Sequence, residues 1–205
     1  TPYDVEARFS KKRETRWVGY KVHLTETCDD GDSPNLITDV TTTPATTSDM
    51  TMPGRMQQQL DARGLAPAEH LVDAGYVCAD TLVRSQQAQI DLVGPTQPEP
   101  GWRAKANAGF AGSCFVLDWD AEQATCPEGQ VSVQWQPQPD HEGRPSVAIR
   151  FAKATCAACS ARTSCVGTAQ GPRSLLVHER THYEALQAAR QRQRTDAFTE
   201  TYADR

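Results

Sequence analysis

The 205-residue sequence predicts an α/β fold that is interrupted by a β-rich, cysteine-rich module and ends in a helix. Three observations support this prediction. Strand-like and helix-like patterns alternate over residues 1–95, five of the seven cysteines lie within residues 96–175, and residues 179–202 contain neither glycine nor proline. We therefore expect a partial core over 1–95, a cysteine-rich β insertion over 96–175, and a helix over 176–205 that returns to the core.

A β-hairpin is predicted near the start of the chain. Residues 17–24 (WVGYKVHL) alternate between apolar and polar side chains, as is typical of a half-buried strand. Residues 28–35 have the Asp, Gly, Ser and Pro composition of a turn, and residues 36–41 (LITDVT) follow as a second strand. The two strands are expected to pair antiparallel.

Two helices and two short strands follow, which gives the order β-β-α-β-α-β. They are a helix over 51–63, a strand over 69–72, a helix over 79–89 and a strand over 90–94. Ser48 or Asp49 can cap the first helix, and Gly64 ends it.

The insertion begins where prolines and a glycine interrupt regular structure, over residues 95–101. Short strands are expected over 115–119, 131–135 and 146–151. The final segment is rich in Ala, Gln, Arg and Glu, which favours one helix from 179 to about 202.

Charged residues are distributed unevenly along the chain. A formal charge of -5 and a mean hydropathy of -0.60 argue against a chain that coats nucleic acid by bulk electrostatics. Residues 1–24 nevertheless hold six Lys/Arg against three acids, and the middle of the chain is acidic. Basic ends around an acidic centre suit a metal site with DNA-contacting arms, although ordinary solvated charge explains the same pattern.

The sequence predicts a cytoplasmic protein without a membrane span. No apolar run is long enough to cross a bilayer, and residues 1–16 are charged and lack the apolar region of a signal peptide. The chain starts at Thr1 and ends at Arg205 without the appearance of natural termini, so we expect a fragment of a longer protein.

Asp73 is the candidate catalytic residue. A carboxylate that follows a buried strand projects at the edge of the sheet, where α/β folds place their sites. Gly75 permits a tight turn there, and Tyr76 offers an aromatic wall. On the residues alone, capping of the following turn or helix is the more common role for such an aspartate.

Residues 71–76 (LVDAGY) resemble the segment that holds the second carboxylate of bacterial insertion-sequence DDE transposases, which have a ribonuclease-H-like core. Three further stretches are similar to the same family in the same order: residues 3–8 (YDVEAR), 17–24 (WVGYKVHL) and 42–49 (TTPATTSD). A Cys-Pro-x-Gly turn at 126–129, followed by Cys-x-x-Cys at 156–159, resembles the cysteine cluster of a subgroup of that family. The resemblance runs from about residue 2 to the C-terminus.

The resemblance implies a partial ribonuclease-H-like mixed sheet and metal-dependent cleavage and strand transfer of DNA. In that family, three carboxylates hold two divalent ions, for which Mg²⁺ is suited. Asp73 matches the second carboxylate, whereas the first would precede Thr1 and the third, a glutamate, would follow Arg205. Asp4 and Glu200 are the less well matched alternatives within the chain.

The isolated chain is accordingly expected to be inactive. The partners implied for the complete enzyme are insertion-sequence ends, target DNA and, in a homodimer, a second copy of the enzyme. Two other functions fit the residues: a zinc-stabilised DNA- or protein-binding module without catalysis, and a stand-alone metal nuclease of the same fold.

Four cysteines form the candidate structural zinc site: Cys126, Cys156, Cys159 and Cys165. Clustered cysteines without a secretory signal more often bind metal than form disulfides, and four thiolates suit tetrahedral Zn²⁺ in a zinc-ribbon-like module. Reduced non-ligating thiols, a disulfide or an iron–sulfur site are the alternatives. The other cysteines, Cys28, Cys78 and Cys114, do not occur at ligand spacing.

A basic segment near the start of the chain is the candidate DNA contact: Lys11, Lys12, Arg13, Arg16 and Lys21, interleaved with Phe9 and Trp17. Basic side chains next to aromatic ones can hold DNA phosphates near a site. An exposed basic loop before a strand is the alternative. His178 and His182 lack the intervening glutamate of a metalloprotease helix.

Overall fold

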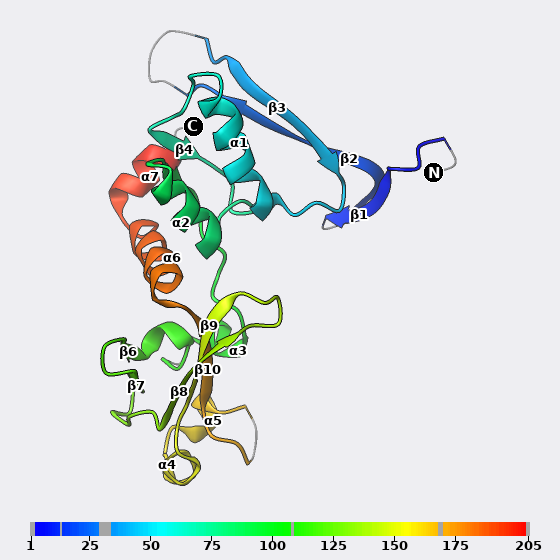
Figure 1. Ribbon diagram of the computed structural model, residues 1–205. Helices are drawn as coiled ribbons and strands as arrows, with labels where there is room; N and C mark the ends of the chain where they lie inside the picture. The colour runs from blue at the N-terminus through cyan, green and yellow to red at the C-terminus, as the bar shows by residue number, and fades with distance from the viewer. Residues whose placement is uncertain (1–2, 13, 29–33, 108, 168–169, 204–205) are drawn as a thin grey trace. The chain divides into compact units, whose positions relative to one another are not determined.

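The computed structural model describes residues 3–12, 14–28, 34–107, 109–167 and 170–203 (Figure 1). The chain forms two compact units: the first comprises residues 1–96 and 186–205, and the second comprises residues 97–185. Both contain sheets and helices, so the predicted mixed α/β class is confirmed.

The first unit begins with a three-stranded antiparallel sheet of order β1-β2-β3. Its strands are β1 (Arg8–Lys12), β2 (Thr15–Glu26) and β3 (Ile37–Pro44). The predicted hairpin is confirmed and is longer than expected, with Tyr20 paired to Pro44 and Leu24 to Val40. Strand β1 was not predicted, because its Lys and Arg content hides the period-two signal.

The two faces of this sheet differ in polarity. Alternation along β2 buries His23, and along β3 it buries Thr41 and Thr43 on the face against which α1 packs. Val22 and Leu24 lie on the opposite face and are each 60% exposed. The inward face is therefore polar, which is unusual for a buried sheet surface and leaves hydrogen-bonding groups available to neighbouring elements.

A parallel βαβ unit follows the sheet. Its elements are the 3-10 helix η1 (Asp49–Thr51), α1 (Met52–Asp61), β4 (Glu69–Leu71), α2 (Ala79–Gln87) and β5 (Asp91–Val93). Strands β4 and β5 pair in parallel, with His70 opposite Leu92. The predicted elements are confirmed, and Gly64 adopts the left-handed φ of 70° just beyond α1. The expected side-chain cap by Ser48 or Asp49 is wrong. Ser48 precedes η1 without a side-chain cap bond, Asp49 lies inside η1, and the residue that precedes α1 is Thr51.

The core of this unit lies between its helices and the parallel strands. Met52, Met56 and Leu60 from α1 are buried, as are Val83 of α2 and Leu92 of β5. Their spacing along α1 follows the helical period of three to four residues, which places them on one face.

A buried polar group completes this core and predicts pH-dependent stability. The Gln57 amide donates to Ser85 Oγ at 2.8 Å, and its nitrogen lies 3.4 Å from Nδ1 of His70. Burial lowers the pKa of His70 from its ordinary value of 6.5, so folding favours the neutral ring. The neutral His70 ring therefore stabilises the fold fully only above the pKa that His70 has in the unfolded chain. As the pH falls below that value, the unfolded chain binds a proton that the folded chain does not, and this stabilisation is lost.

We therefore expect the urea midpoint of unfolding to decrease between pH 7.5 and pH 5.5. His70→Gln removes the titrating ring but keeps a polar partner for Gln57, so it should reduce this decrease. Burial also lowers the pKa of His23, which leaves part of the pH dependence in the variant. An unchanged pH dependence in His70→Gln would contradict the assignment.

The second unit is built on a sheet of order β10-β9-β8 and a small β6-β7 hairpin. Its strands are β6 (Val116–Asp118), β7 (Gln123–Thr125), β8 (Gln134–Pro139), β9 (Pro145–Arg150) and β10 (Ser174–His178). The strands expected over 115–119 and 146–151 are confirmed. The strand expected over 131–135 overlaps only the start of β8, whose prolines are tolerated because β8 lies at the sheet edge.

Short helices flank these strands: α3 (Trp102–Ala106), the 3-10 helix η2 (Gly112–Cys114), α4 (Lys153–Ala158) and α5 (Arg162–Cys165). None of them was predicted, because three to six residues carry little periodicity. The core of the unit contains Phe115, Ile149, Phe151, Cys165 and Leu175.

The C-terminal segment forms two helices, α6 (Arg180–Arg192) and α7 (Asp196–Ala203), where one was predicted. Thr195 explains the break, since its hydroxyl donates to the Arg192 carbonyl and accepts from the Phe198 amide. Helix α6 starts in the second unit and ends in the first, where Arg192 pairs with Asp91 at 2.7 Å. Among the described residues, no helix has the length and apolar character needed to cross a membrane.

Candidate functional site

Asp73 lies at the carboxyl end of β4, in the first unit. The Val72 amide still donates to the Val93 carbonyl, so the pairing of the two parallel strands continues up to the residue before Asp73. Gly94 permits this approach, because a Cβ there would lie 2.3 Å from the Val72 carbonyl oxygen. Asp73 itself is exposed at this edge of the pair.

A tight turn holds the backbone of Asp73 and leaves its carboxylate accessible. The Tyr76 amide donates to the Asp73 carbonyl at 2.9 Å. Within the described residues, the carboxylate has one hydrogen-bond partner, the Tyr202 hydroxyl at 3.5 Å. Helix α2 starts later, at Ala79, and the amide before it is capped by Thr81 Oγ1 at 2.9 Å. Asp73 is therefore not the cap of α2.

The C-terminal helix α7 reaches this strand end through Tyr202. Its hydroxyl donates to the Val72 carbonyl at 3.3 Å as well as lying near Asp73. Burial, followed by the Asp73 charge, raises the pKa of Tyr202 above its usual value. Two segments that are 129 residues apart thus meet at the candidate catalytic carboxylate.

A second carboxylate, Asp49, lies beside the same turn. A Cβ added to Gly75 would lie 3.5 Å from Asp49 Oδ2. Lys21 Nζ donates to Asp49 Oδ1 at 2.8 Å and to the Thr47 carbonyl at 2.7 Å. Sequence reasoning treated Asp49 as a helix cap, but the structure directs its carboxylate to Lys21.

His23 connects the turn to the antiparallel sheet. Its Nδ1 lies 2.7 Å from the Tyr76 hydroxyl, and its Nε2 lies 3.1 Å from Thr43 Oγ1. Burial lowers the pKa of His23, and burial followed by the nearby Asp49 and Asp73 charges raises the pKa of Tyr76. Sequence reasoning missed His23, although its inward position in the alternation of β2 was a usable signal.

The alternative carboxylates are placed differently. Asp4 accepts hydrogen bonds from the Tyr20 hydroxyl at 2.9 Å and from two backbone amides, and the Tyr20 bond is the main reason that its pKa is lowered. Glu200 is exposed on α7. Across the described ranges, no group of three or more His, Cys, Asp or Glu side chains could hold a metal ion.

The candidate DNA-contacting lysines and arginines lie in two different environments. Lys11 and Arg16 are directly paired across β1 and β2 and are exposed, and Lys12 pairs with Thr15. Lys21 lies on the opposite face of β2 from Arg16, in its ion pair with Asp49. Arg13 lies outside the described residues. Like charges directly opposite each other in a sheet are destabilising, so an anionic partner would relieve the Lys11–Arg16 pair.

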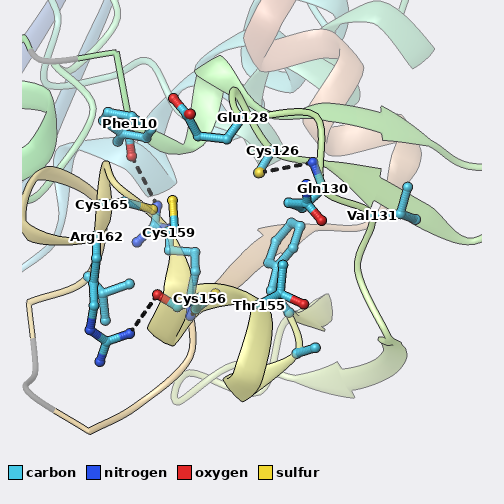
Figure 2. A pocket seen from close by; sticks show the side chains of 14 residues that line it. Phe110, Cys126, Glu128, Gln130, Val131, Thr155, Cys156, Cys159, Arg162 and Cys165 are labelled. Atoms are coloured by element: carbon cyan, nitrogen blue, oxygen red, sulfur yellow. Dashed lines mark hydrogen bonds between the residues drawn. The ribbon is translucent and has the colours of Figure 1, made fainter.

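All four candidate zinc ligands line one cavity of about 30 Å³ in the second unit (Figure 2). Cys156 belongs to α4, Cys159 follows this helix directly, and Cys165 ends α5. Cys126 comes from the turn after β7, where Gly129 has a left-handed φ of 74°. The Gln130 amide donates to Cys126 Sγ at 3.3 Å in this turn.

Cys156 accepts hydrogen bonds at both its sulfur and its carbonyl oxygen. The Arg173 amide donates to Cys156 Sγ at 3.4 Å, and Arg162 donates to the Cys156 carbonyl at 3.0 Å. Burial is the largest cause that raises the pKa of Cys165, while the Arg173 charge opposes it. Within the described residues, none of the four cavity cysteines forms a disulfide. Thiol sulfurs that line one cavity are donors of the kind that tetrahedral Zn²⁺ takes.

Residues 125–205 match the family model of the transposase DDE domain. This match covers less than half of the chain; it includes the four cavity cysteines, α6 and α7, and it excludes Asp73. Neither a curated protein nor a solved structure matches the chain.

Proposed function

We propose that the chain is part of a bacterial insertion-sequence DDE transposase, which hydrolyses DNA phosphodiesters and transfers strands during transposition. The observation that carries this proposal is the meeting of Asp73 and α7: an exposed carboxylate at the end of a parallel strand contacts Tyr202, which belongs to the matched segment. The resemblance of residues 71–76 to the segment of the second catalytic carboxylate supports the same assignment.

In this proposal, residues 1–95 are a partial ribonuclease-H-like core, 96–175 a cysteine-rich insertion, and 176–205 the helical return to the core. Asp73 would supply one ligand for Mg²⁺. When bound, the metal would activate a water or a 3′-hydroxyl for attack and stabilise the leaving oxygen. The oxygens of Asp73 fit this ion chemically. A single carboxylate holds Mg²⁺ poorly, so the first and third carboxylates would come from outside residues 1–205.

We further propose a structural role for zinc in the second unit, with Cys126, Cys156, Cys159 and Cys165 as ligands. The donor set fits, because four reduced thiols line one cavity and two of them accept backbone N–H bonds. Since the described side chains do not yet form a metal-holding group, zinc binding would have to draw the thiols together.

The proposal is tested with the full-length protein and DNA that carries the ends of its element. We expect cleavage at those ends and joining to target DNA, both dependent on Mg²⁺ or Mn²⁺. A pure non-catalytic module would bind DNA without cleaving it, and that result with an intact reading frame would overturn the proposal.

The basic segment near the start of the chain is predicted to bind DNA phosphates without regard to base sequence. Changing Lys11, Lys12 and Arg13 together to Gln should weaken DNA binding similarly for all sequences. The slope of log K against log salt should become shallower by about 0.9 for each phosphate that the variant no longer neutralises. Lys153→Gln, which changes an exposed lysine on α4, serves as the matched control. An unchanged slope in the triple variant would leave these residues as an ordinary solvated surface.

A further inference from the structure

A short chain of hydrogen bonds links the antiparallel sheet to the turn that carries Asp73. His23 is 2% exposed, and its ring meets the Tyr76 ring edge-on, with centroids 5.7 Å apart and an interplanar angle of 78°. The Tyr76 hydroxyl lies 2.7 Å from Nδ1 of His23, and Thr43 Oγ1 lies 3.1 Å from Nε2. Both ring nitrogens are therefore occupied by side chains from different elements.

This arrangement suits a neutral imidazole, which has one donor and one acceptor nitrogen. If Nδ1 accepts from the Tyr76 hydroxyl, then Nε2 donates to Thr43, and the opposite tautomer reverses both bonds. In either case the two neighbours are complementary, so the ring is held in one orientation. The neighbouring charges of Asp49, Lys21 and Arg55 partly offset one another at His23.

Tyr76 transmits this constraint to Asp73. Its amide donates to the Asp73 carbonyl at 2.9 Å and closes the turn, while its hydroxyl is held at the far end by His23. Asp49 lies next to the turn at Gly75: a Cβ atom on Gly75 would be in van der Waals contact with the Asp49 side chain. The Asp73 carboxylate has little support of its own, because its hydrogen-bond partner in the described structure is the Tyr202 hydroxyl at 3.5 Å.

We propose that His23 is a positioning residue for Asp73 and acts through Tyr76. This inference rests on the proposed role of Asp73 as a ligand of the catalytic Mg²⁺. Mg²⁺ demands nearly ideal octahedral geometry, so a ligand whose backbone turn is loose binds it less well. A displacement of about 1 Å at a reacting group can reduce the rate by roughly 100-fold.

Two substitutions at His23 separate its two bonds. In His23→Asn, the amide group lies near the former Nδ1 position and can still meet the Tyr76 hydroxyl. In His23→Gln, the amide group lies near the former Nε2 position and meets Thr43 instead. Tyr76→Phe keeps the aromatic ring and removes only the hydroxyl, so it tests the same bond from the other side with minimal risk to folding.

The experiment measures DNA cleavage by the full-length protein as a function of Mg²⁺ concentration. We expect His23→Gln and Tyr76→Phe each to raise the Mg²⁺ concentration for half-maximal cleavage about 10-fold, a partial loss of the positioning effect. His23→Asn should remain close to wild type. The double variant His23→Gln/Tyr76→Phe should be no worse than either single variant, because both remove one bond.

Wild-type Mg²⁺ dependence in Tyr76→Phe would overturn the inference, as would equal losses in His23→Asn and His23→Gln, which indicate packing alone. Thermal unfolding of each variant identifies losses of activity that are due to misfolding. If the His23 variants do not fold, the result for Tyr76→Phe alone tests the inference. The Asp73→Asn variant separates the two proposals. If it cleaves normally, the proposed function fails; if it is inactive while Tyr76→Phe behaves as wild type, only the role of His23 fails.

Discussion

Replacing Asp73 by asparagine in the full-length protein is expected to reduce DNA cleavage and strand transfer by about 1000-fold or more. The change removes the negative charge that a hard divalent cation requires, and a 1000-fold loss corresponds to about 4 kcal/mol of transition-state stabilisation. The two side chains have nearly the same shape. Because the Asp73 carboxylate is exposed and has only the Tyr202 hydroxyl as a partner in the described residues, folding and DNA binding should change little.

Cleavage of an end-containing DNA, DNA binding and thermal unfolding should be measured on the same preparation. Asp61→Asn, at the exposed end of α1, is a matched control that should retain activity. A variant that cleaves at the wild-type rate would refute the catalytic assignment. A variant that unfolds would instead indicate that Asp73 stabilises the turn before Tyr76.

The second large effect is expected from Cys156→Ser. Structural zinc sites bind with about 10–16 kcal/mol, so losing one of four thiolates should remove roughly 3 kcal/mol, or about 100-fold in zinc affinity. Zinc should also raise the unfolding temperature of the wild-type chain, because metal binding to the folded state is coupled to folding. In the zinc-loaded protein, the four sulfurs should lie within about 4 Å of one another, as zinc–sulfur bonds of about 2.3 Å require.

Zinc content, chelator competition and the cobalt absorption spectrum measure this directly. Cys114→Ser changes an exposed cysteine that does not line the cavity and should leave all three unchanged. Purified wild-type protein that contains no zinc and has four freely reactive thiols at Cys126, Cys156, Cys159 and Cys165 would contradict the proposal. Loss of zinc binding in Cys114→Ser would show that the ligand set is wrong.

Local patterns were sufficient for most of the first unit. The period-two alternation over 17–24 predicted β2. The possible caps before residue 51 and the closing Gly64 predicted the helix that became α1. The position of Asp73 after a short apolar strand followed from the same reasoning. Where local signals were weak, prediction failed: the basic strand β1 and the four-residue helix α5 show no clear period.

The break between α6 and α7 failed for a different reason. The composition of 179–202 favours helix throughout, but the Thr195 side chain competes with the backbone for hydrogen bonds. Such competition depends on the conformation of a few residues and is not visible in their average helix propensity.

The sequence by itself determined the α/β class, the strand that precedes Asp73 and the candidate cysteines, because periodicity and motif spacing are properties of consecutive residues. Only the tertiary structure decided what surrounds them. It placed Tyr202 at Asp73, His23 at Tyr76 and Asp49 beside Gly75, and it gathered four cysteines around one cavity. These interactions join residues that are far apart in the chain, and they depend on how helices and strands pack, which no local pattern specifies.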